Sequence, residues 1–318
     1  MARSAKAPIP ELRPQAGRWE YALDVHEHPG VGSLRIAAEQ LDLACRELAV
    51  SESPVALRVH EFRKRSKKIR SLSRLIRSGF DGHAEVNKLF GHLARQTSDA
   101  RDARIVMDLV ERYLAETGSA QHVRPVAAWF RGRCETAEQG AERTLAGLRQ
   151  ALADAAADTP HCDSSGVDRA TVLVGLRDTL CRARAALTAA RANPAATTFH
   201  DLRKRCKDHW HHLCLVRPAL PTRLKPRTGK FERLCELLGL AQDRAVLIAH
   251  LEALPEDLQI DSDTAAALER ARREQHELRE TIMEQATRLL EIDPDRFSAR
   301  VGRHWERLAS ATKDRVRM

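Results

Sequence analysis

The sequence predicts an all-α protein. Alanine, leucine, arginine and glutamate are abundant among the 318 residues, and aromatic residues make up only 4%. Apolar residues recur at the three- and four-residue spacing of a helix face rather than at every second position, as in a strand. No Asn-Gly or Asp-Gly pair joins two alternating apolar runs, which would indicate a β-hairpin. A chain of this length can bury a sizeable core.

Apolar periodicity between helix-breaking residues predicts two sets of four helices and one final helix. The first set is expected near residues 33–50, 55–78, 84–115 and 122–156, with a break around Ser98–Asp102 as an alternative to a continuous third helix. The second set is expected near residues 167–192, 197–216, 228–253 and 262–291, and the final helix near 296–316. Four helices per set suggest two four-helix bundles side by side.

The chain ends and linkers follow from composition. Residues 1–32 are rich in proline and are expected to form a poorly ordered arm, and they contain basic residues without the apolar stretch of a signal peptide. The polar segment 158–166 is the expected linker between a first repeat of about 33–157 and a second of about 167–313.

The two sets are copies of one unit. Aligning His60 with His200 gives H-[ED]-[FL]-R-K-R-[SC]-K in both, with five of eight positions identical. An aspartate follows each histidine at nearly equal spacing, Asp102 after 42 residues and Asp243 after 43. A period of about 140 residues corresponds to a whole helical unit rather than to a short solenoid module.

The net charge of +9 is concentrated in two windows. His60–Arg77 holds eight Lys/Arg and one acid, and His200–Lys230 holds nine Lys/Arg and two acids, so each window has a net charge of +7. The rest of the chain is therefore net acidic. Such clustering is typical of a binding footprint for an anion.

A helical wheel separates charge from apolar residues in both basic segments. The first cationic stripe consists of His60, Arg63, Lys64, Lys67 and Arg74, opposite Phe62, Ile69, Leu72 and Ile76. The second consists of His200, Arg203, Lys204, Lys207 and His211, opposite Leu202, Leu213 and Val216. Arg65 and Arg205 fall off the stripes and are expected either to extend their charged ends to the surface or to pair with acids. If the stripes meet, they form one cationic groove suited to a long polyanion.

The duplicated H-x-x-R-K-x-x-K on an amphipathic helix, followed about 40 residues later by ARD or AQD, resembles the CHAD family, the conserved histidine α-helical domain. The resemblance covers roughly residues 33–313. It implies two pseudo-symmetric four-helix bundles with a central basic channel, whose His, Lys and Arg residues bind inorganic polyphosphate. It also implies association with polyphosphate granules.

The resemblance assigns polyphosphate contacts to His60, Arg63, Lys64 and Lys67 and to His200, Arg203, Lys204 and Lys207. Arg70, Arg74 and His211 extend the two stripes. Weaker matches are Lys68, Arg101 and Arg244, the last standing in where Gln242 replaces the arginine of the first copy. Arg133 and Arg272 are expected either to face the channel or to form surface ion pairs. Because Asp208 and Trp210 occupy the positions of Lys68 and Arg70, the first copy is expected to supply more charge.

No catalytic group, metal site or cofactor is predicted, so the protein is expected not to be an enzyme. His209, His211 and His212 cannot all face one ion from a regular helix, and His209 falls on the apolar face. The His200–Asp201 pair lacks the other ligands of a metal-dependent phosphohydrolase. No P-loop, nucleophile elbow or ExExK motif is present. Asp102 and Asp243 are interpreted as helix caps or as partners of channel arginines.

Two other functions stay open. A protein that binds single-stranded nucleic acid or RNA would use the same charges, but such proteins interleave aromatic and basic residues, and Trp210 is the only aromatic residue at a stripe edge. A phosphohistidine enzyme of polyphosphate metabolism would use His60 or His200, but no general acid or pair of metal-binding carboxylates accompanies them.

Cysteine usage and hydropathy predict the compartment. Seven scattered cysteines without a CxxC pair indicate free thiols in a reducing environment. No window approaches 18 consecutive apolar residues, so no membrane partner is expected. We therefore expect a cytoplasmic protein. The resemblance to the CHAD family further implies that it lies at polyphosphate granules, with other granule proteins as further partners.

Overall fold

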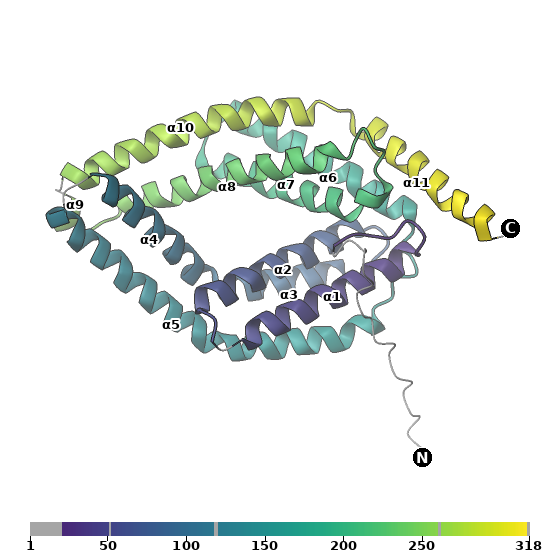
Figure 1. Ribbon diagram of the computed structural model, residues 1–318, viewed down its shortest axis with the longest axis horizontal. Helices are drawn as coiled ribbons and strands as arrows, with labels where there is room; N and C mark the ends of the chain where they lie inside the picture. The colour runs from purple at the N-terminus through teal and green to yellow at the C-terminus, as the bar shows by residue number, and fades with distance from the viewer. Residues whose placement is uncertain (1–20, 51, 118–119, 260–261, 317–318) are drawn as a thin grey trace, which may run out of the picture.

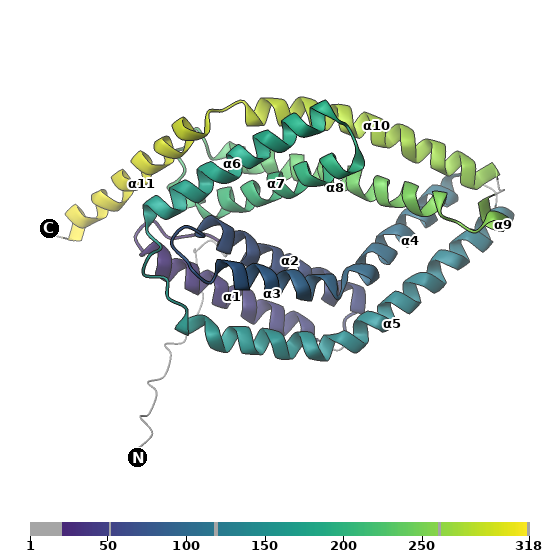
Figure 2. The same cartoon turned by 180° about the vertical axis from the view of Figure 1, so that it is seen from behind.

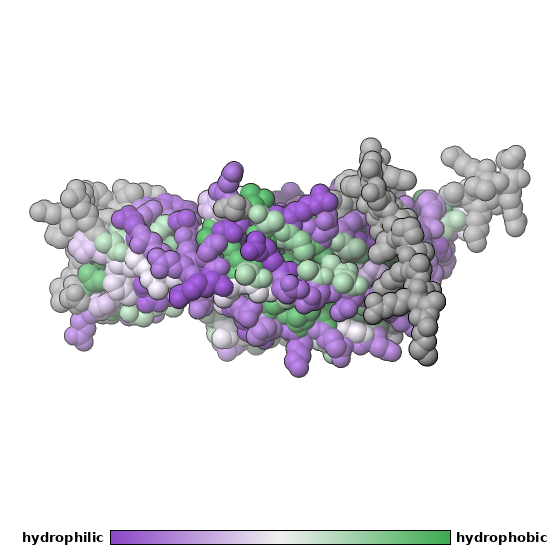
Figure 3. Space-filling view, turned by 90° about the horizontal axis from the view of Figure 1, so that it is seen from below, coloured by the Kyte–Doolittle hydropathy of each residue, from purple (hydrophilic) through white to green (hydrophobic). Residues whose placement is uncertain are grey.

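The computed structural model describes residues 21–50, 52–117, 120–259 and 262–316, and this part of the chain consists of helices and short turns without a β-strand. The all-α prediction is confirmed. Figures 1 and 2 show α1, α2, α3 and the C-terminal part of α5 on one side, and α6, α7, α8 and α10 on the other. Figure 3 shows the molecule from below as a slab much thinner than it is wide, with mixed hydrophilic and hydrophobic residues on the visible face. None of the described helices is long and apolar enough to cross a membrane.

Among its described residues the first copy contains five helices, because its third predicted helix is broken. The break falls at Gln96–Thr97, just before the predicted position, and the hydroxyls of Thr97 and Ser98 donate hydrogen bonds to the carbonyl oxygens of Ala94 and Arg95. These bonds satisfy carbonyls that the end of the helix leaves free. The helices are α1 Pro29–Ala49, α2 Val55–Leu75, α3 His83–Arg95, α4 Ser98–Thr117 and α5 Ala120–Asp158.

In the second copy, one continuous helix, α8, corresponds to the broken pair α3 and α4. The first helix of this copy, α6, begins after Asp168, whose Oδ1 accepts a hydrogen bond from the backbone N–H of Thr171 at 2.7 Å. The helices are α6 Arg169–Ala192, α7 Ala196–Leu215, α8 Pro226–Glu252, α9 Glu256–Gln259, α10 Ser262–Leu290 and α11 Pro294–Val316.

The apolar core does not divide at the boundary between the copies. One cluster lies among α1, α2, α3 and α5 around Phe62 and Leu148, and a second fills the second copy but also includes Leu75 of α2. A third cluster combines α4 and α5 with α8 and α10, with Val110 and Leu251 among its members. Figures 1 and 2 show α4 and the start of α5 reaching across to α8 and α10 at one end. Shared cores therefore fix the two copies relative to each other.

The prediction of a poorly ordered arm at residues 1–32 is wrong for its last part, while residues 1–20 lie outside the described residues. Tyr21 and Leu23 are buried, and α1 already begins at Pro29. The backbone N–H of Leu23 donates to the carbonyl oxygen of Leu215 at 2.8 Å, and the Tyr21 hydroxyl donates to that of Lys68 at 2.7 Å. Burial of an aromatic and an aliphatic side chain orders this segment against α2 and α7.

Helices α2 and α6 approach so closely that only glycine fits at one point of contact. A Cβ atom added at Gly175 of α6 would lie 1.9 Å from the carbonyl oxygen of Leu75 at the end of α2. Backbone atoms cannot move aside as a flexible side chain can. Gly175 therefore sets the distance between the helix that carries the first stripe and the second copy.

The Gly175→Ala variant is expected to lower the free energy of unfolding by about 1–3 kcal/mol because it overpacks this contact. Chemical denaturation monitored by circular dichroism measures the change. Gly147→Ala on α5 is the matched control, since no atom lies within 4 Å of its added Cβ. There, removal of a helical glycine is expected to raise stability by up to about 1 kcal/mol. Equal effects of the two substitutions would contradict the close contact.

Candidate anion-binding site

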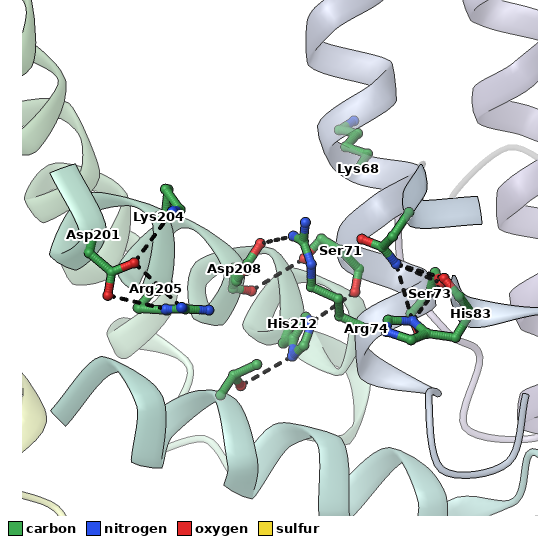
Figure 4. Close-up of polar contacts among 12 residues, drawn as sticks. Lys68, Ser71, Ser73, Arg74, His83, Asp201, Lys204, Arg205, Asp208 and His212 are labelled. Carbon is green, nitrogen blue, oxygen red and sulfur yellow. Dashed lines mark hydrogen bonds and ion pairs between the residues drawn. The ribbon is translucent and has the colours of Figure 1, made fainter. Parts of the chain in front are cut away.

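Helices α2 and α7 pack against each other, and polar groups hold this contact between the copies. Arg74 of α2 donates to Asp208 of α7 at 2.6 Å, with both side chains largely buried (Figure 4). Close by, His212 Nε2–H donates to the carbonyl oxygen of Ser71 at 2.8 Å, and His212 Nδ1 lies 3.1 Å from the Thr179 hydroxyl. Burial raises the pKa of Asp208, although the charge of Arg74 acts in the opposite direction.

Beside this contact, cations from three helices converge. Burial and the charges of Arg101, Arg203, Arg63 and Lys207 lower the pKa of Lys67 to about 7. Lys67 and Arg63 come from α2, Arg101 from α4, and Arg203 and Lys207 from α7. The stripes of the two copies therefore converge here, and we call these five residues the central cluster.

Two arginines of the central cluster keep buried donors without a protein acceptor. The Nε atoms of Arg63 and Arg203 are buried and form no hydrogen bond with the described residues, although Arg63 also donates through Nη1 to the carbonyl oxygen of Ala94. Burial and the charge of Arg101 lower the pKa of both arginines. The normal pKa of arginine is so high that both side chains still stay charged. A buried donor left unpaired costs about 1–3 kcal/mol. These groups are thus prepared for an acceptor from outside the protein.

Three carboxylates near the central cluster offset only part of its positive charge. Arg101 Nη1 donates to Asp102 at 2.8 Å, which agrees with the interpretation of this aspartate as a partner of a channel arginine. Burial raises the pKa of Asp243, and the charges of Arg101 and Arg203 lower it. Glu232 also acts on Lys207, so five cations face three acids and the positive potential of the central cluster persists.

The two repeated histidines lie at the exposed starts of the stripes. Burial lowers the pKa of His60; the charges of Lys67 and Lys64 act in the same direction, and that of Glu61 opposes it. His200 Nδ1 lies 2.9 Å from Gln242 Oε1, an acceptor only, so Nδ1 carries the proton. The free Nε2 of His200 can then donate to an anion only when the ring is protonated.

Lys64 and Lys204 are exposed near these histidines and form local ion pairs. Lys64 Nζ lies 3.0 Å from Glu61, and Lys204 Nζ lies 3.4 Å from Asp201, three residues earlier in each case. Figure 4 shows the second pair turned away from Arg74 and Asp208. Exposed pairs of this kind contribute little and exchange readily. Both lysines can therefore reach an incoming anion, but neither belongs to the central cluster.

Two stripe residues have structural roles that the helical wheel did not predict. Arg74 is held by Asp208. His211 is buried edge-on against Tyr21, with ring centroids 5.9 Å apart. Burial and the charge of Lys207 keep the pKa of His211 well below its usual range, so it is neutral at pH 7. Its assignment to the exposed cationic stripe is wrong because Tyr21, from the segment expected to be disordered, covers it.

The weaker candidates lie mostly outside the central cluster. Arg244 is buried and donates to Glu274 at 3.0 Å, so it does not stand in for Arg101. Of the two alternatives for Arg272, the structure shows the surface ion pair, with Arg272 Nη2 at 2.7 Å from Glu252 Oε1. Arg133 stacks on Trp129, with its guanidinium 4.7 Å from the ring centroid, and the amine of Lys68 lies 4.9 Å from the ring centroid of Tyr21.

Arg70 continues the positive surface along α2. Its Nε is buried without a partner, and its guanidinium lies close to Gly91 of α3, where Arg95 also approaches. Arg95 was not predicted, because helix α3 carries no repeated basic motif. Asp208 and His212 were missed as well: each acts through a partner on α2 that is far away in the sequence.

These features define an all-α protein in which cations from both copies of an internal repeat converge beside the contact between α2 and α7. A family model described as CHAD domain matches residues 35–252. The chain belongs to the CHAD family. The crystal structure of the CHAD domain from the plant Ricinus communis is similar, with a TM-score of 0.60 and 18% identity over 92% of this chain and 97% of that chain. No curated protein matches the sequence.

We expect one lysine, Lys67, to titrate near pH 7 in the free protein. NMR of ¹³C-methylated lysines measures this, and the Lys67→Arg variant identifies the signal by its loss. Arg203→Gln should raise the pKa of Lys67, because it removes one of the positive charges that lower it. Lys88→Gln, at an exposed position of α3, should leave it unchanged. A lysine signal that titrates only near the normal value would contradict the converging stripes.

Acid should destabilise the fold through the buried histidines. Burial lowers the pKa of His212 to about 3 and those of His209 and His211 well below normal. Below about pH 6.5 the unfolded chain binds protons that the folded protein excludes, so the free energy of unfolding falls as pH falls toward 3. Each histidine contributes up to about 1.4 kcal/mol per pH unit.

Urea denaturation between pH 7.5 and pH 5 measures this slope. His212→Gln keeps an N–H donor for Ser71 but cannot be protonated, so its slope should be shallower by about one proton. An unchanged slope would show that His212 does not carry the effect.

Proposed function

We propose that this protein binds inorganic polyphosphate, without turning it over, through the central cluster and the adjoining His60 and His200. The observation that supports it most is the position of Lys67, whose pKa of about 7 reflects burial beside cations from both copies. Such a concentration of positive charge is unfavourable without an anion, and the unpaired Nε donors of Arg63 and Arg203 require acceptors.

A phosphate polymer suits this chemistry. Each phosphate offers oxygens that arginine can bind in a fork, while lysine acts as a mobile point charge. One chain can contact both stripes at once, so the contacts of each copy add to an effectively intramolecular binding event. Release of condensed counterions adds affinity that depends on salt.

Nucleic acid is the second candidate, and the aromatic residues near the central cluster disfavour it. The ring of Trp210 is covered by Lys207, whose amine lies 4.0 Å from the ring centroid, and Trp210 Nε1 is buried. Tyr21 is buried under Lys68. Bases that stack on aromatic faces would find neither ring free. A bare phosphate chain needs no such surface.

The proposal includes no catalytic step. His60 and His200 serve as hydrogen-bond donors when protonated, which fits their place at the ends of the stripes better than a role as phosphoryl carriers. We extend the proposal to polyphosphate granules, where the stored polymer itself would be the docking partner.

The charge reversals Lys67→Glu and Lys207→Glu test whether both copies form one site. Each should weaken binding of long polyphosphate by at least about tenfold and reduce its salt dependence, because a charge-assisted contact contributes about 1.5–3 kcal/mol. The double variant should lose less than the sum of the two, since the residues share one ligand. Titration by calorimetry at several salt concentrations, with RNA and single-stranded DNA of matched charge as competitors, measures these effects.

Lys88→Glu is the matched control: it makes the same charge change at an exposed position of α3 and should leave affinity nearly unchanged. A tagged wild-type protein should gather at granules in cells that store the polymer, and the double variant should not. If RNA binds as tightly as polyphosphate, the nucleic-acid alternative is preferred. Wild-type affinity in the Lys207→Glu variant would exclude a site shared by the two copies.

A further inference from the structure

The basic window His200–Lys230 contains two groups of cations that the fold separates. Arg203 and Lys207 lie on α7 and join the central cluster, whereas Arg227 and Lys230 lie in the first turns of α8. The central cluster therefore leaves a large part of the positive charge of this window unexplained.

A cleft of about 380 Å³ lies between the beginning of α8 and the end of α10. Its volume falls within the range of about 300–1,000 Å³ that is usual for small-ligand sites. We call it the α8–α10 cleft. Four cations, one amide and one leucine line it: Arg227, Lys230, Arg233, Gln285, Arg288 and Leu289.

Arg227 is held in place with part of its guanidinium unpaired. Its Nη2 donates to the carbonyl oxygen of Leu289 at 2.5 Å, and its Cζ lies 5.6 Å from the ring centroids of both Phe231 and Phe297. Its Nε is buried and has no acceptor in the part of the chain that the structure describes. Burial alone lowers the pKa of Arg227, without an opposing carboxylate. A fixed, desolvated guanidinium of this kind is a strong site for an oxyanion.

The other three cations can turn toward the same ligand. Lys230 and Arg233 are exposed and form no ion pair within the described chain. Arg288 pairs with Glu284 at 2.5 Å, but both side chains are largely exposed, so the pair is weak and can exchange.

The α8–α10 cleft is separate from the central cluster. At about 100° per residue, the arc from Arg227 to Arg233 is centred on Lys230, which lies about 140° around α8 from both Cys235 and Asp243. Cys235 and Asp243 face Lys207 and Arg203 of α7. Figures 1 and 2 show α10 on the outer side of α8. One anion of a few phosphates therefore cannot occupy both sites.

We propose that the α8–α10 cleft is a second anion site, which binds a short phosphate oligomer of the size of tripolyphosphate independently of the central cluster. Arg227 provides the fixed fork, and Lys230, Arg233 and Arg288 neutralise the remaining charge. The ligand can be a free oligomer or the end of a long chain bound elsewhere on the protein.

Calorimetry with tripolyphosphate on the full chain tests the site. In the Lys67→Glu/Lys207→Glu background, where the central cluster is disabled, one binding site should remain. Adding Lys230→Glu/Arg233→Glu should weaken it by more than about tenfold. Adding Arg143→Glu/Arg149→Glu, the same charge change at exposed positions of α5, should leave it intact.

Long polyphosphate distinguishes the two sources of ligand. If a chain end occupies the α8–α10 cleft, Lys230→Glu/Arg233→Glu in the otherwise wild-type protein weakens long-chain binding as well; if only free oligomers bind, long-chain affinity is unchanged. Equal tripolyphosphate affinity with and without the Lys230/Arg233 reversal, or an equal loss in the Arg143/Arg149 variant, would overturn the proposal. If Lys67→Glu/Lys207→Glu leaves long-chain binding unchanged, the proposed function of the central cluster fails while the α8–α10 cleft stands.

Discussion

The contact between α2 and α7 determines how the two cationic stripes face each other. The stripes repel, so they stay together only because other groups hold their helices in register. Arg74 and Asp208 join the helices by an ion pair, His212 adds a buried hydrogen bond to the backbone of Ser71, and Gly175 lets α6 meet the end of α2 without a gap. At the opposite end, the apolar core that α4 and α5 share with α8 and α10 holds the two copies together.

The site therefore exists before any ligand arrives. Packing and cross-helix bonds offset the repulsion within the central cluster, so an anion meets donors that are already oriented and needs to order few side chains. The buried, unpaired Nε donors of Arg63 and Arg203 add to the free-energy cost of keeping the central cluster in place. Buried donors without a partner among the described residues lower stability, and under the proposed function a bound phosphate would satisfy them.

The sequence predicted which helix faces carry charge but not what covers each face. Periodicity and the repeat identified Lys67, Arg203 and Lys207, since a helical wheel needs only local spacing. The pair of Arg74 with Asp208 spans 134 residues, and the burial of His211 depends on Tyr21, so neither follows from local pattern. The all-α class was predicted because it also follows from local spacing. The core that both copies share was not predicted, because it joins segments that are distant in the sequence. Composition treats the window His200–Lys230 as one basic segment, whereas the fold divides its cations between α7 and the start of α8.

Under the proposed function, the lowered pKa of Lys67 couples anion binding at the central cluster to the uptake of a proton. An anion bound there stabilises the ammonium form, so above about pH 7 the protein takes up a proton from solution as the anion binds. The positive charge of the central cluster therefore depends on pH and on the anion. Above about pH 7 Lys67 is mostly neutral in the anion-free protein and becomes protonated when an anion binds. Anion binding at the central cluster and protonation of Lys67 are coupled in both directions, because release of the anion returns the proton to the solution.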